Sequence, residues 1–421
     1  MQVITENKLV PKLRFGEFDS EWKQTALGNT SEIIGGGTPE TVKPEYWGGM
    51  IQWFTPSELK QKYVSKSKRT ITDIGLKKSS AKILPKGTLL FSSRATVGEV
   101  AIALNECCTN QGFQSFVVNS LNNSEFLYNW IIENKNKFIK LSSGSTFLEI
   151  SKKEIVKIKL HLPSLPEQQK IASFLSAVDD KLQQLTKKKD LLEEYKKGVM
   201  QKIFSQELRF KDDNGNNYPD WEIQKIQKLL NEGVIISHLD GNHGALYPKS
   251  EEFTKEGVPY VTANDFIGGF VDINGCRCLP EDRAKQFKKG IARNGDVLFA
   301  HNATVGPTAI LQTQLDYVIL STTATYYRCN IEKLDNKFLV KVFESNFFVK
   351  QYSRVMSQST RNQVPITMQR TFFIPLPHLP EQQKIANFLS ALDVKIELVI
   401  TQIVNTQSFK KGLLQQMFVA A

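Results

Sequence analysis

The sequence predicts an α+β protein with two β-rich domains separated by an antiparallel pair of long helices. The segment PEQQKIASFLSAVD, which starts at Pro166, returns as PEQQKIANFLSALD at Pro380. The offset is 380 − 166 = 214 residues, about half of the 421-residue chain. Short strand-like runs precede each copy, and each copy continues as a long helical pattern. A tandem duplication of this size predicts two equivalent halves related by a pseudo-two-fold axis.

Composition indicates a globular protein with an anionic partner. The formal net charge is +11 and the pI is about 9.2, which suits nucleic acid first and a membrane surface second. Many proteins carry such an excess for solubility alone. No run of 18 apolar residues occurs, and the five cysteines lack disulfide or zinc spacing. We therefore expect reduced, buried thiols and a cytoplasmic location.

The β-rich domains are predicted over residues 1–165 and 207–379. Their short apolar runs are bounded by Gly, Asn and Ser, as is typical of strands. The run GTLLF at 87–91 returns as GDVLF at 295–299. Aromatic and aliphatic residues at helical spacing predict one helix late in each domain, and these residues are expected in the core rather than stacked on bases.

The long helices are predicted over residues 166–206 and 380–421. Their apolar residues recur in steps of four and three, which over about 40 residues argues for a coiled coil. Two helices of equal length favour antiparallel packing within one chain, and an intermolecular coiled coil is the alternative. The seam residues are Ile171, Leu175, Val178, Leu182, Leu185, Leu192, Val199 and Ile203 in the first copy, and Ile385, Leu389, Leu392, Ile396, Val399, Ile403, Leu413 and Met417 in the second.

No catalytic motif accompanies this architecture. The chain contains no Walker A sequence, no G-x-G-x-x-G after a strand, no H-E-x-x-H and no G-x-S-x-G. The five histidines are scattered, and GGGTP at 35–39 suits a turn better than a phosphate-binding loop. We therefore expect no enzymatic activity, no bound metal and no cofactor in this chain.

Several polar side chains suit contact with DNA. Lysines and an arginine cluster in the first domain, where a solvated surface is the alternative interpretation. The loop around Arg94 corresponds to the loop around His301 and Asn302, and Arg pairs with guanine edges whereas Asn pairs with adenine. Neutral drift between the two loops is the alternative. The predicted DNA-binding residues are Lys60, Lys62, Lys66, Lys68, Arg69, Arg94, His301, Asn302, Arg361 and Asn362.

The polar start of each helix is also repeated. A coiled-coil seam constrains only its apolar positions, so repeated polar residues indicate either a recent duplication or a shared partner. The diverged β-rich domains weigh against a recent event. We expect these residues to dock the same kind of partner: Glu167, Gln168, Gln169, Lys170, Glu381, Gln382, Gln383 and Lys384.

The chain resembles the specificity subunits of type I restriction–modification enzymes. The resemblance rests on both LPxLPEQQKIAxFLSAxD segments, both Lys-Lys-Gly…Phe helix ends and both Leu-Arg-Phe…Trp openings, and it covers essentially the whole chain. It implies two target-recognition domains that read a split site in double-stranded DNA, with two helices as spacer. It also implies docking of two methyltransferase subunits and of motor-nuclease restriction subunits.

The resemblance further implies that S-adenosylmethionine, ATP and magnesium belong to the partner subunits. The first domain carries the family-like GGTP turn, whereas the second has Ser237–Gly241 in its place, so the resemblance does not predict the conformation of this loop. A stand-alone DNA-binding scaffold, or an anti-restriction or regulatory protein, is one alternative. A nuclease or methyltransferase fused to its own specificity region is another, although its motifs are missing.

Overall fold

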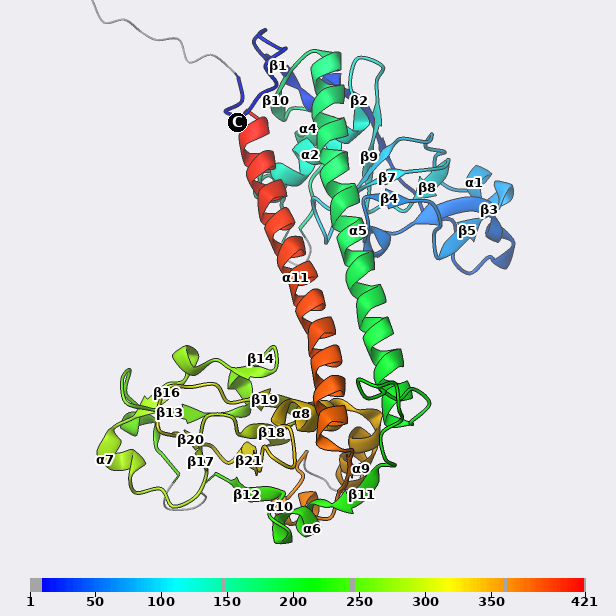
Figure 1. Cartoon of the computed structure of the whole chain (residues 1–421). Helices are drawn as coiled ribbons and strands as arrows, with labels where there is room; N and C mark the ends of the chain where they lie inside the picture. Colours follow the sequence, from blue (N-terminus) through cyan, green and yellow to red (C-terminus); the bar gives the residue numbers. More distant parts are fainter. Residues whose placement is uncertain (1–9, 145–147, 242–246, 359–361, 420–421) are drawn as a thin grey trace, which may run out of the picture. The chain divides into compact units, whose positions relative to one another are not determined.

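The computed structural model describes residues 10–144, 148–241, 247–358 and 362–419. The chain divides into two compact units, one of residues 1–186 with 401–421 and the other of residues 187–400 (Figure 1). Each unit mixes sheets and helices, which confirms the predicted α+β class. The unit limits fall within the long helices, whereas the predicted domain boundaries lie at helix ends and stay predictions.

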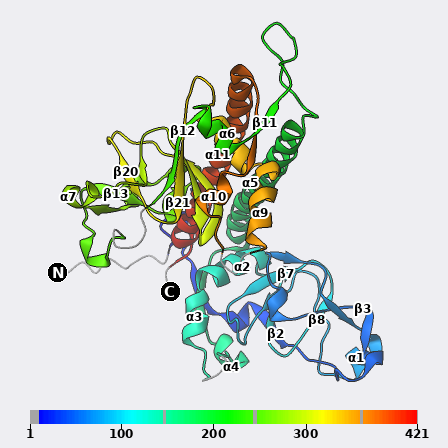
Figure 2. The ribbon, with the colours of Figure 1, turned by 90° about the horizontal axis from the view of Figure 1, so that it is seen from below.

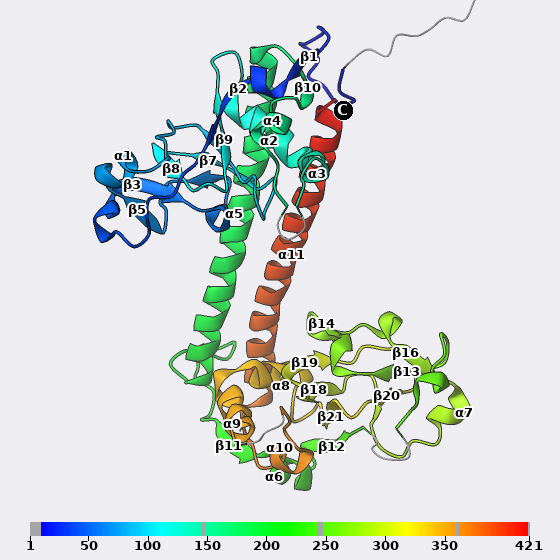
Figure 3. The same cartoon turned by 180° about the vertical axis from the view of Figure 1, so that it is seen from behind.

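The first unit contains a five-stranded sheet, a three-stranded sheet and a two-stranded ribbon, in the orders β2-β9-β6-β7-β4, β5-β3-β8 and β1-β10. Figures 1 and 3 place the small sheet and α1 at the side of this unit away from α5, and Figure 2 shows α1 and β3 at the opposite end from α3 and α4. The strands are β1 Lys23–Ala26, β2 Ser31–Gly35, β3 Trp47–Phe54, β4 Tyr63–Val64, β5 Arg69–Ile71, β6 Leu89–Phe91, β7 Val100–Ala103, β8 Cys107–Thr109, β9 Gln114–Val118 and β10 Lys159–Leu162. The short helices are α1 Asp73–Lys77, α2 Ser124–Glu133, α3 Lys135–Lys140 and α4 Lys152–Ile155.

The second unit repeats this plan with a larger main sheet. Its sheets have the orders β12-β21-β18-β19-β15-β14, β16-β13-β20-β17 and β11-β22. The strands are β11 Glu222–Lys225, β12 Ile235–Asp240, β13 Val258–Val261, β14 Phe266–Ile267, β15 Phe270–Val271, β16 Arg277–Leu279, β17 Ile291–Ala292, β18 Val297–Asn302, β19 Thr304–Ile310, β20 Val318–Leu320, β21 Ala324–Cys329 and β22 Phe373–Leu376. The short helices are α6 Ile226–Asn231, α7 Glu281–Ala284, α8 Asn336–Glu344, α9 Asn346–Met356 and α10 Ile366–Gln369.

The long helices are α5, Leu165–Phe204, and α11, Leu379–Met417. Each has proline in its first turn, where the missing N–H costs no helical hydrogen bond, followed by a glutamate at the positive end of the helix dipole. The hydrophobic cores of the two units account for the repeated apolar residues of the seam. The core of each unit contains residues from the start of one long helix and residues from the end of the other. The first core holds Ile171, Leu175 and Val178 with Leu413, Leu414 and Met417; the second holds Val199 and Ile203 with Ile385, Leu389 and Leu392.

The residues at 237–241 do not form a turn equivalent to GGTP. Residues 237–240 belong to β12 and pair antiparallel with β21. Gly241 follows where the backbone passes so close to Ser321 that a Cβ atom would lie 2.3 Å from its carbonyl carbon. Gly36 is equally crowded by Thr109 and Asn110 in the first unit, so both units require glycine at this crossing although the neighbouring sequences differ.

The cysteines are buried in the cores of their units. Cys107, Cys108, Cys276, Cys278 and Cys329 are all free thiols. Burial raises the pKa of Cys107 and of Cys108 to about 12, so these thiols stay protonated at neutral pH. Among the described residues no three His, Cys, Asp or Glu side chains gather as metal ligands, and no helix is both long and apolar enough to cross a membrane.

Candidate nucleic-acid interface

The first unit presents a hairpin tip that carries Arg94. The tip joins β6 to β7, and a second segment, residues 148–150, pairs antiparallel with it. The N–H of Ala95 donates to the carbonyl of Leu148 at 2.9 Å, and the N–H of Ile150 donates to the carbonyl of Ser93 at 2.9 Å. Arg94 itself lies opposite Glu149, and its side chain is about half exposed.

The second unit presents the same construction around Asn302. The tip joins β18 to β19, and residues 362–364 pair with it. The N–H of Ala303 donates to the carbonyl of Asn362 at 3.0 Å, and the N–H of Val364 donates to the carbonyl of His301 at 2.8 Å. Asn302 lies opposite Gln363. Thus the two units share one backbone frame but display different side chains on it.

Both tips contain an alanine in the left-handed region. Ala95 has φ 63° and Ala303 has φ 64°, and these are two of the three described non-glycine residues with positive φ. An L-residue pays about 1–2 kcal/mol for this conformation. The clamping hydrogen bonds from Ala95 and Ala303 hold it in place. Strain kept at the same place in both units points to a function for the tip.

His301 does not lie on the surface of its tip. Its side chain is buried at 1% exposure, and its Nδ1 lies 3.2 Å from the carbonyl of Val364. The imidazole of His301 therefore contacts the paired segment inside the unit, and its ring is not accessible to DNA. Asn302 is half-buried and Asn362 is exposed, so both remain candidates, whereas Arg361 lies outside the described residues.

The lysine cluster divides into two groups. Lys60, Lys66, Lys68 and Arg69 are exposed beside the small sheet of the first unit. The Arg69 guanidinium of β5 stacks on Trp47, the first residue of β3, 3.5 Å from the ring centroid, which restrains the arginine side chain. These four side chains can approach a phosphate backbone, and their DNA contacts stay predictions.

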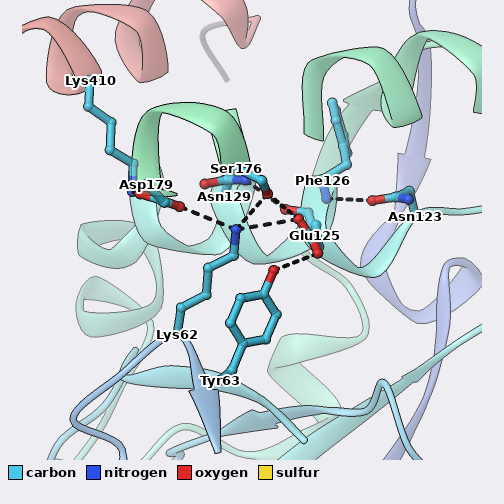
Figure 4. Close-up of polar contacts among 9 residues, drawn as sticks. All are labelled: Lys62, Tyr63, Asn123, Glu125, Phe126, Asn129, Ser176, Asp179 and Lys410. Atoms are coloured by element: carbon cyan, nitrogen blue, oxygen red, sulfur yellow. Dashed lines mark hydrogen bonds and ion pairs between the residues drawn. The ribbon is translucent and has the colours of Figure 1, made fainter. Parts of the chain in front are cut away.

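Lys62 has a structural role instead. Its ammonium donates to the Ser176 hydroxyl at 2.8 Å and forms ion pairs with Asp179 at 3.2 Å and Glu125 at 3.4 Å (Figure 4). Burial disfavours the charged form, but the two carboxylates outweigh it and raise the pKa of Lys62. Since the Lys62 side chain is 12% exposed and its ammonium already has three partners, the predicted DNA contact has no free donor.

The second unit builds the equivalent cluster from another lysine. Tyr63 pairs with Ile102 as Phe270 pairs with Ile310, so Gly269 is the counterpart of Lys62. In the second unit Lys341 of α8 supplies the ammonium between the two carboxylates, 2.7 Å from Asp393 and 3.1 Å from Glu344. With glycines at 268 and 269, a groove of about 1350 Å³ opens in this unit beside Lys341 and Asp393.

The glutamate at each helix start is buried rather than displayed. Glu167, 1% exposed, accepts from Arg14 Nε at 2.7 Å and from Trp22 Nε1 at 3.2 Å. Glu381, fully buried, accepts from Arg209 Nη2 at 3.1 Å and from Trp221 Nε1 at 2.9 Å. The Leu-Arg-Phe…Trp opening is therefore repeated because its Arg and Trp hold this carboxylate. The joint repetition of this Arg, Trp and Glu in both halves is the sequence pattern from which their contact could have been inferred.

The first glutamine of each repeat is buried as well. Gln168 accepts from the N–H of Asn123 at 3.0 Å, and Gln382 accepts from the N–H of Asp335 at 2.9 Å. Each glutamine thereby joins a long helix to the N-cap of α2 or α8. Glu167, Gln168, Glu381 and Gln382 do not suit the predicted docking surface, because buried side chains cannot meet a partner.

The next two residues of each repeat are more accessible, although Lys384 is only partly exposed. Gln169 and Gln383 are exposed. Lys170 pairs with Glu17 at 3.3 Å and remains about half exposed, whereas Lys384 pairs with Asp213 at 2.6 Å. Partner docking at these four positions stays a prediction.

Comparisons with known proteins match this two-unit plan. A family model described as the type I restriction modification DNA specificity domain matches residues 19–194 and 220–405. The type I restriction enzyme MjaIX specificity subunit of Methanocaldococcus jannaschii is 28% identical over 413 residues, covering 96% of this chain and 94% of the relative. In fold, the chain is similar to the solved S subunit of a type I restriction–modification system from M. genitalium, with TM-score 0.61 and 16% identity over 98% of this chain and all of that one. A chain from a second solved type I system, determined to explain complex assembly and conformational transition, gives TM-score 0.59 and 17% identity over 95% and 98% of the two chains.

Proposed function

Because the chain belongs to the family of type I restriction–modification DNA specificity subunits, we propose that each unit reads one half of a bipartite site in double-stranded DNA. The protein is the DNA-sequence specificity subunit of a multi-subunit complex and is not itself an enzyme. The resemblance noted in the sequence is thereby confirmed. What remains to be proposed is how the units divide the task and which subunits they meet.

One observation carries the proposal of two readers. The tips of the two units share their backbone pairing, hydrogen bond by hydrogen bond, yet carry Arg94 in one and Asn302 in the other. Base edges distinguish such side chains, whereas the phosphate backbone does not. A shared backbone arrangement that carries a different side chain in each unit suits the recognition of two half-sites that differ in sequence.

Phosphate contacts would supply most of the affinity. Lys60, Lys66, Lys68 and Arg69 are exposed on one part of the first unit. Lysine and arginine neutralise phosphates and release counterions, so binding driven by them weakens steeply as salt rises. The formal net charge of +11 agrees with this role.

The complex would contain two methyltransferase subunits and restriction subunits. The repeated residues Gln169 and Lys170, with Gln383 and Lys384, give each unit a similar surface for the same kind of partner; three of them are exposed and Lys384 is half-buried. S-adenosylmethionine would bind to the methyltransferase subunits, and ATP with magnesium would bind to the restriction subunits. The whole complex would act in the cytoplasm, where its DNA lies.

A binding selection with the full-length chain tests the proposal. Duplexes with two randomised blocks separated by variable gaps are bound, recovered and sequenced at low and at moderate salt. We expect enrichment of two short motifs at one preferred gap, and no methyl transfer by the chain alone. A single enriched motif, or no motif, would contradict the two-reader proposal.

Co-expression with a type I methyltransferase subunit from the same organism separates the alternatives. Stable co-purification supports a specificity subunit within its complex. A chain that selects a bipartite site but never retains a methyltransferase subunit would instead be a stand-alone DNA-binding or regulatory protein.

A further inference from the structure

The paired segments bring a second polar side chain to each tip. The hydrogen bonds on either side of Arg94 and Glu149 leave these two residues as a non-hydrogen-bonded antiparallel pair. In such a pair the Cα atoms approach to about 4.5 Å and both side chains point to the same face. Asn302 and Gln363 form the same kind of pair in the second unit.

We propose that these two cross-strand pairs determine specificity: Arg94 with Glu149 reads a G·C base pair in the first half-site, and Asn302 with Gln363 reads an A·T base pair in the second. This inference rests on the proposed function, because it assumes that both units bind DNA. It adds two residues, Glu149 and Gln363, that are not among the DNA-binding residues predicted from the sequence.

The first pair complements the major-groove edge of G·C. Guanine offers two acceptors, N7 and O6, and its cytosine offers the N4 amino donor. The Arg94 guanidinium supplies two parallel donors, and the Glu149 carboxylate supplies an acceptor. Two neighbouring side chains of this kind therefore match the row acceptor–acceptor–donor across one base pair.

The second pair complements the edge of A·T. Adenine offers the acceptor N7 beside the donor N6, and thymine offers the acceptor O4. The Asn302 amide can accept from N6 while donating to N7, and the Gln363 amide can donate to O4. A guanidinium in place of the Asn302 amide would set a donor against the N6 amino donor of adenine. A carboxylate in place of the Gln363 amide would set an acceptor against the O4 acceptor of thymine.

The first pair is available for this task. The Nε of Arg94 lies 3.7 Å from the Glu149 carboxylate, and the two side chains are 49% and 51% exposed. An ion pair this exposed contributes little to stability, so exchanging it for base contacts costs little. In the second pair, Gln363 and Asn302 are half-buried, which limits the conformational freedom of both side chains.

The backbone beneath both pairs is held in place in advance. Ala95 and Ala303 adopt left-handed φ values immediately after Arg94 and Asn302, and each N–H is clamped by the opposite segment. This conformation turns the chain sharply at the tip and fixes the direction of the preceding side chain. Preorganised side chains lose less conformational entropy on binding.

An exchange of the pairs between units tests the inference. The double variant Arg94→Asn with Glu149→Gln is compared with the wild-type full-length chain in the bipartite binding selection. We expect one position of the first half-site to change from G·C to A·T, with a roughly tenfold to hundredfold change in preference, and the second half-site to stay the same. The reverse exchange, Asn302→Arg with Gln363→Glu, should change one position of the second half-site from A·T to G·C.

A matched control uses another exposed ion pair of the first unit. Glu154 and Lys157 form one at 3.4 Å, with 42% and 60% exposure. The variant Glu154→Gln with Lys157→Asn should leave both half-sites unchanged. The single variant Glu149→Gln, a minimal surface change, guards against misfolding of the double variant and should weaken discrimination at the same position.

The outcomes separate the two levels of the proposal. If the wild-type chain selects no bipartite site, the proposed function is wrong and the inference falls with it. If the wild-type chain selects one but both exchanges leave it unchanged, the units read DNA elsewhere and only the inference is overturned. An altered position outside the half-site of the mutated unit would also contradict it.

Discussion

Asp179 of α5 forms an ion pair with Lys410 of α11. In the second unit Asp393 of α11 forms one with Lys196 of α5 at 2.5 Å. The offsets are 393 − 179 = 214 and 410 − 196 = 214, equal to that of the duplication. Each repeated carboxylate is therefore neutralised by the repeated lysine of the other copy. Lys196 lies at the seam position between Leu192 and Val199, and Lys410 lies at one between Ile403 and Leu413. The reciprocal ion pairs explain why these two seam positions hold lysine.

Removing the carboxylate of Asp393 should loosen the second unit. Asp393→Asn leaves Lys341, whose side chain is 8% exposed, with fewer charged acceptors for its ammonium. We expect a loss on the order of 1–3 kcal/mol, as for other buried charged groups that lose a partner. Hydrogen exchange of the amides of 187–204 and 379–400 measures it. Glu281→Gln on exposed α7 is the control and should change stability by no more than about 0.5 kcal/mol.

The ion pairs of Asp393 also predict that the stability of the second unit depends on pH. Burial disfavours the Asp393 carboxylate, but hydrogen bonds and charges from Lys196 and Lys341 outweigh it and lower its pKa below 3.8. A depressed pKa stabilises the folded unit above pH 3.8, and this contribution disappears as pH falls through the folded pKa. We expect the wild-type unit to lose stability more steeply than Asp393→Asn in this acid window. Parallel pH profiles would contradict the assignment.

The buried glutamate at the start of α5 should couple strongly to Arg14. Arg14→Ala leaves the Glu167 carboxylate with Trp22 as its remaining side-chain donor among those described here. We expect a loss of about 3 kcal/mol, most of it from the uncompensated charge. The double variant with Glu167→Gln should be less destabilised than the sum of the singles. Urea unfolding measures all three, and additive losses would argue against the pair.

The strained alanine of the first tip makes a paired prediction. Ala95→Val places a β-branched residue at φ 63° and should destabilise the tip by about 1–2 kcal/mol more than Ala95→Gly. Glycine tolerates the conformation, so its variant should stay close to wild type. Hydrogen exchange at Ala95 and Ile150 reports on the clamp, and equal protection in the two variants would show that the tip is not strained.

Phosphate and base contacts should respond differently to mutation. Lys66→Ala should weaken binding to all duplexes alike and lower the salt slope by about 1. Arg94→Ala should cost about 1–3 kcal/mol on the selected site only. Titrations on selected and scrambled duplexes at several salt concentrations separate these cases. Equal losses on both duplexes would make Arg94 a backbone contact.

Periodicity and repetition predicted the two long helices, because both patterns can be read from the sequence without knowledge of tertiary contacts. A 3.5-residue repeat specifies a seam wherever it folds, so α5 and α11 follow from it. The cross-strand partner of Arg94 did not follow, since only the register of a remote segment brings Glu149 opposite it. The burial of Lys62 did not follow from the sequence for the same reason. This lysine stands among solvated lysines, but β4 directs it toward α5.

Glu167 shows a further limit of helical periodicity. It lies off the seam, so the pattern of α5 alone places it in solvent. The segment from Arg14 to Trp22 covers it, and that covering depends on tertiary contacts far apart in sequence. Only the repetition of all three residue types in both halves connects them without a structure.

The sharing of both helices by each unit has a consequence for synthesis. The core of the first unit includes Leu413, Leu414, Met417 and Phe418, which are translated after the whole of the second unit. The apolar surface of the first unit therefore stays open until these residues have been made, while residues 187–400 can fold as an uninterrupted stretch. A nascent chain halted just before Leu413 would hold a complete second unit and an incomplete first unit, although translation of the first unit began earlier.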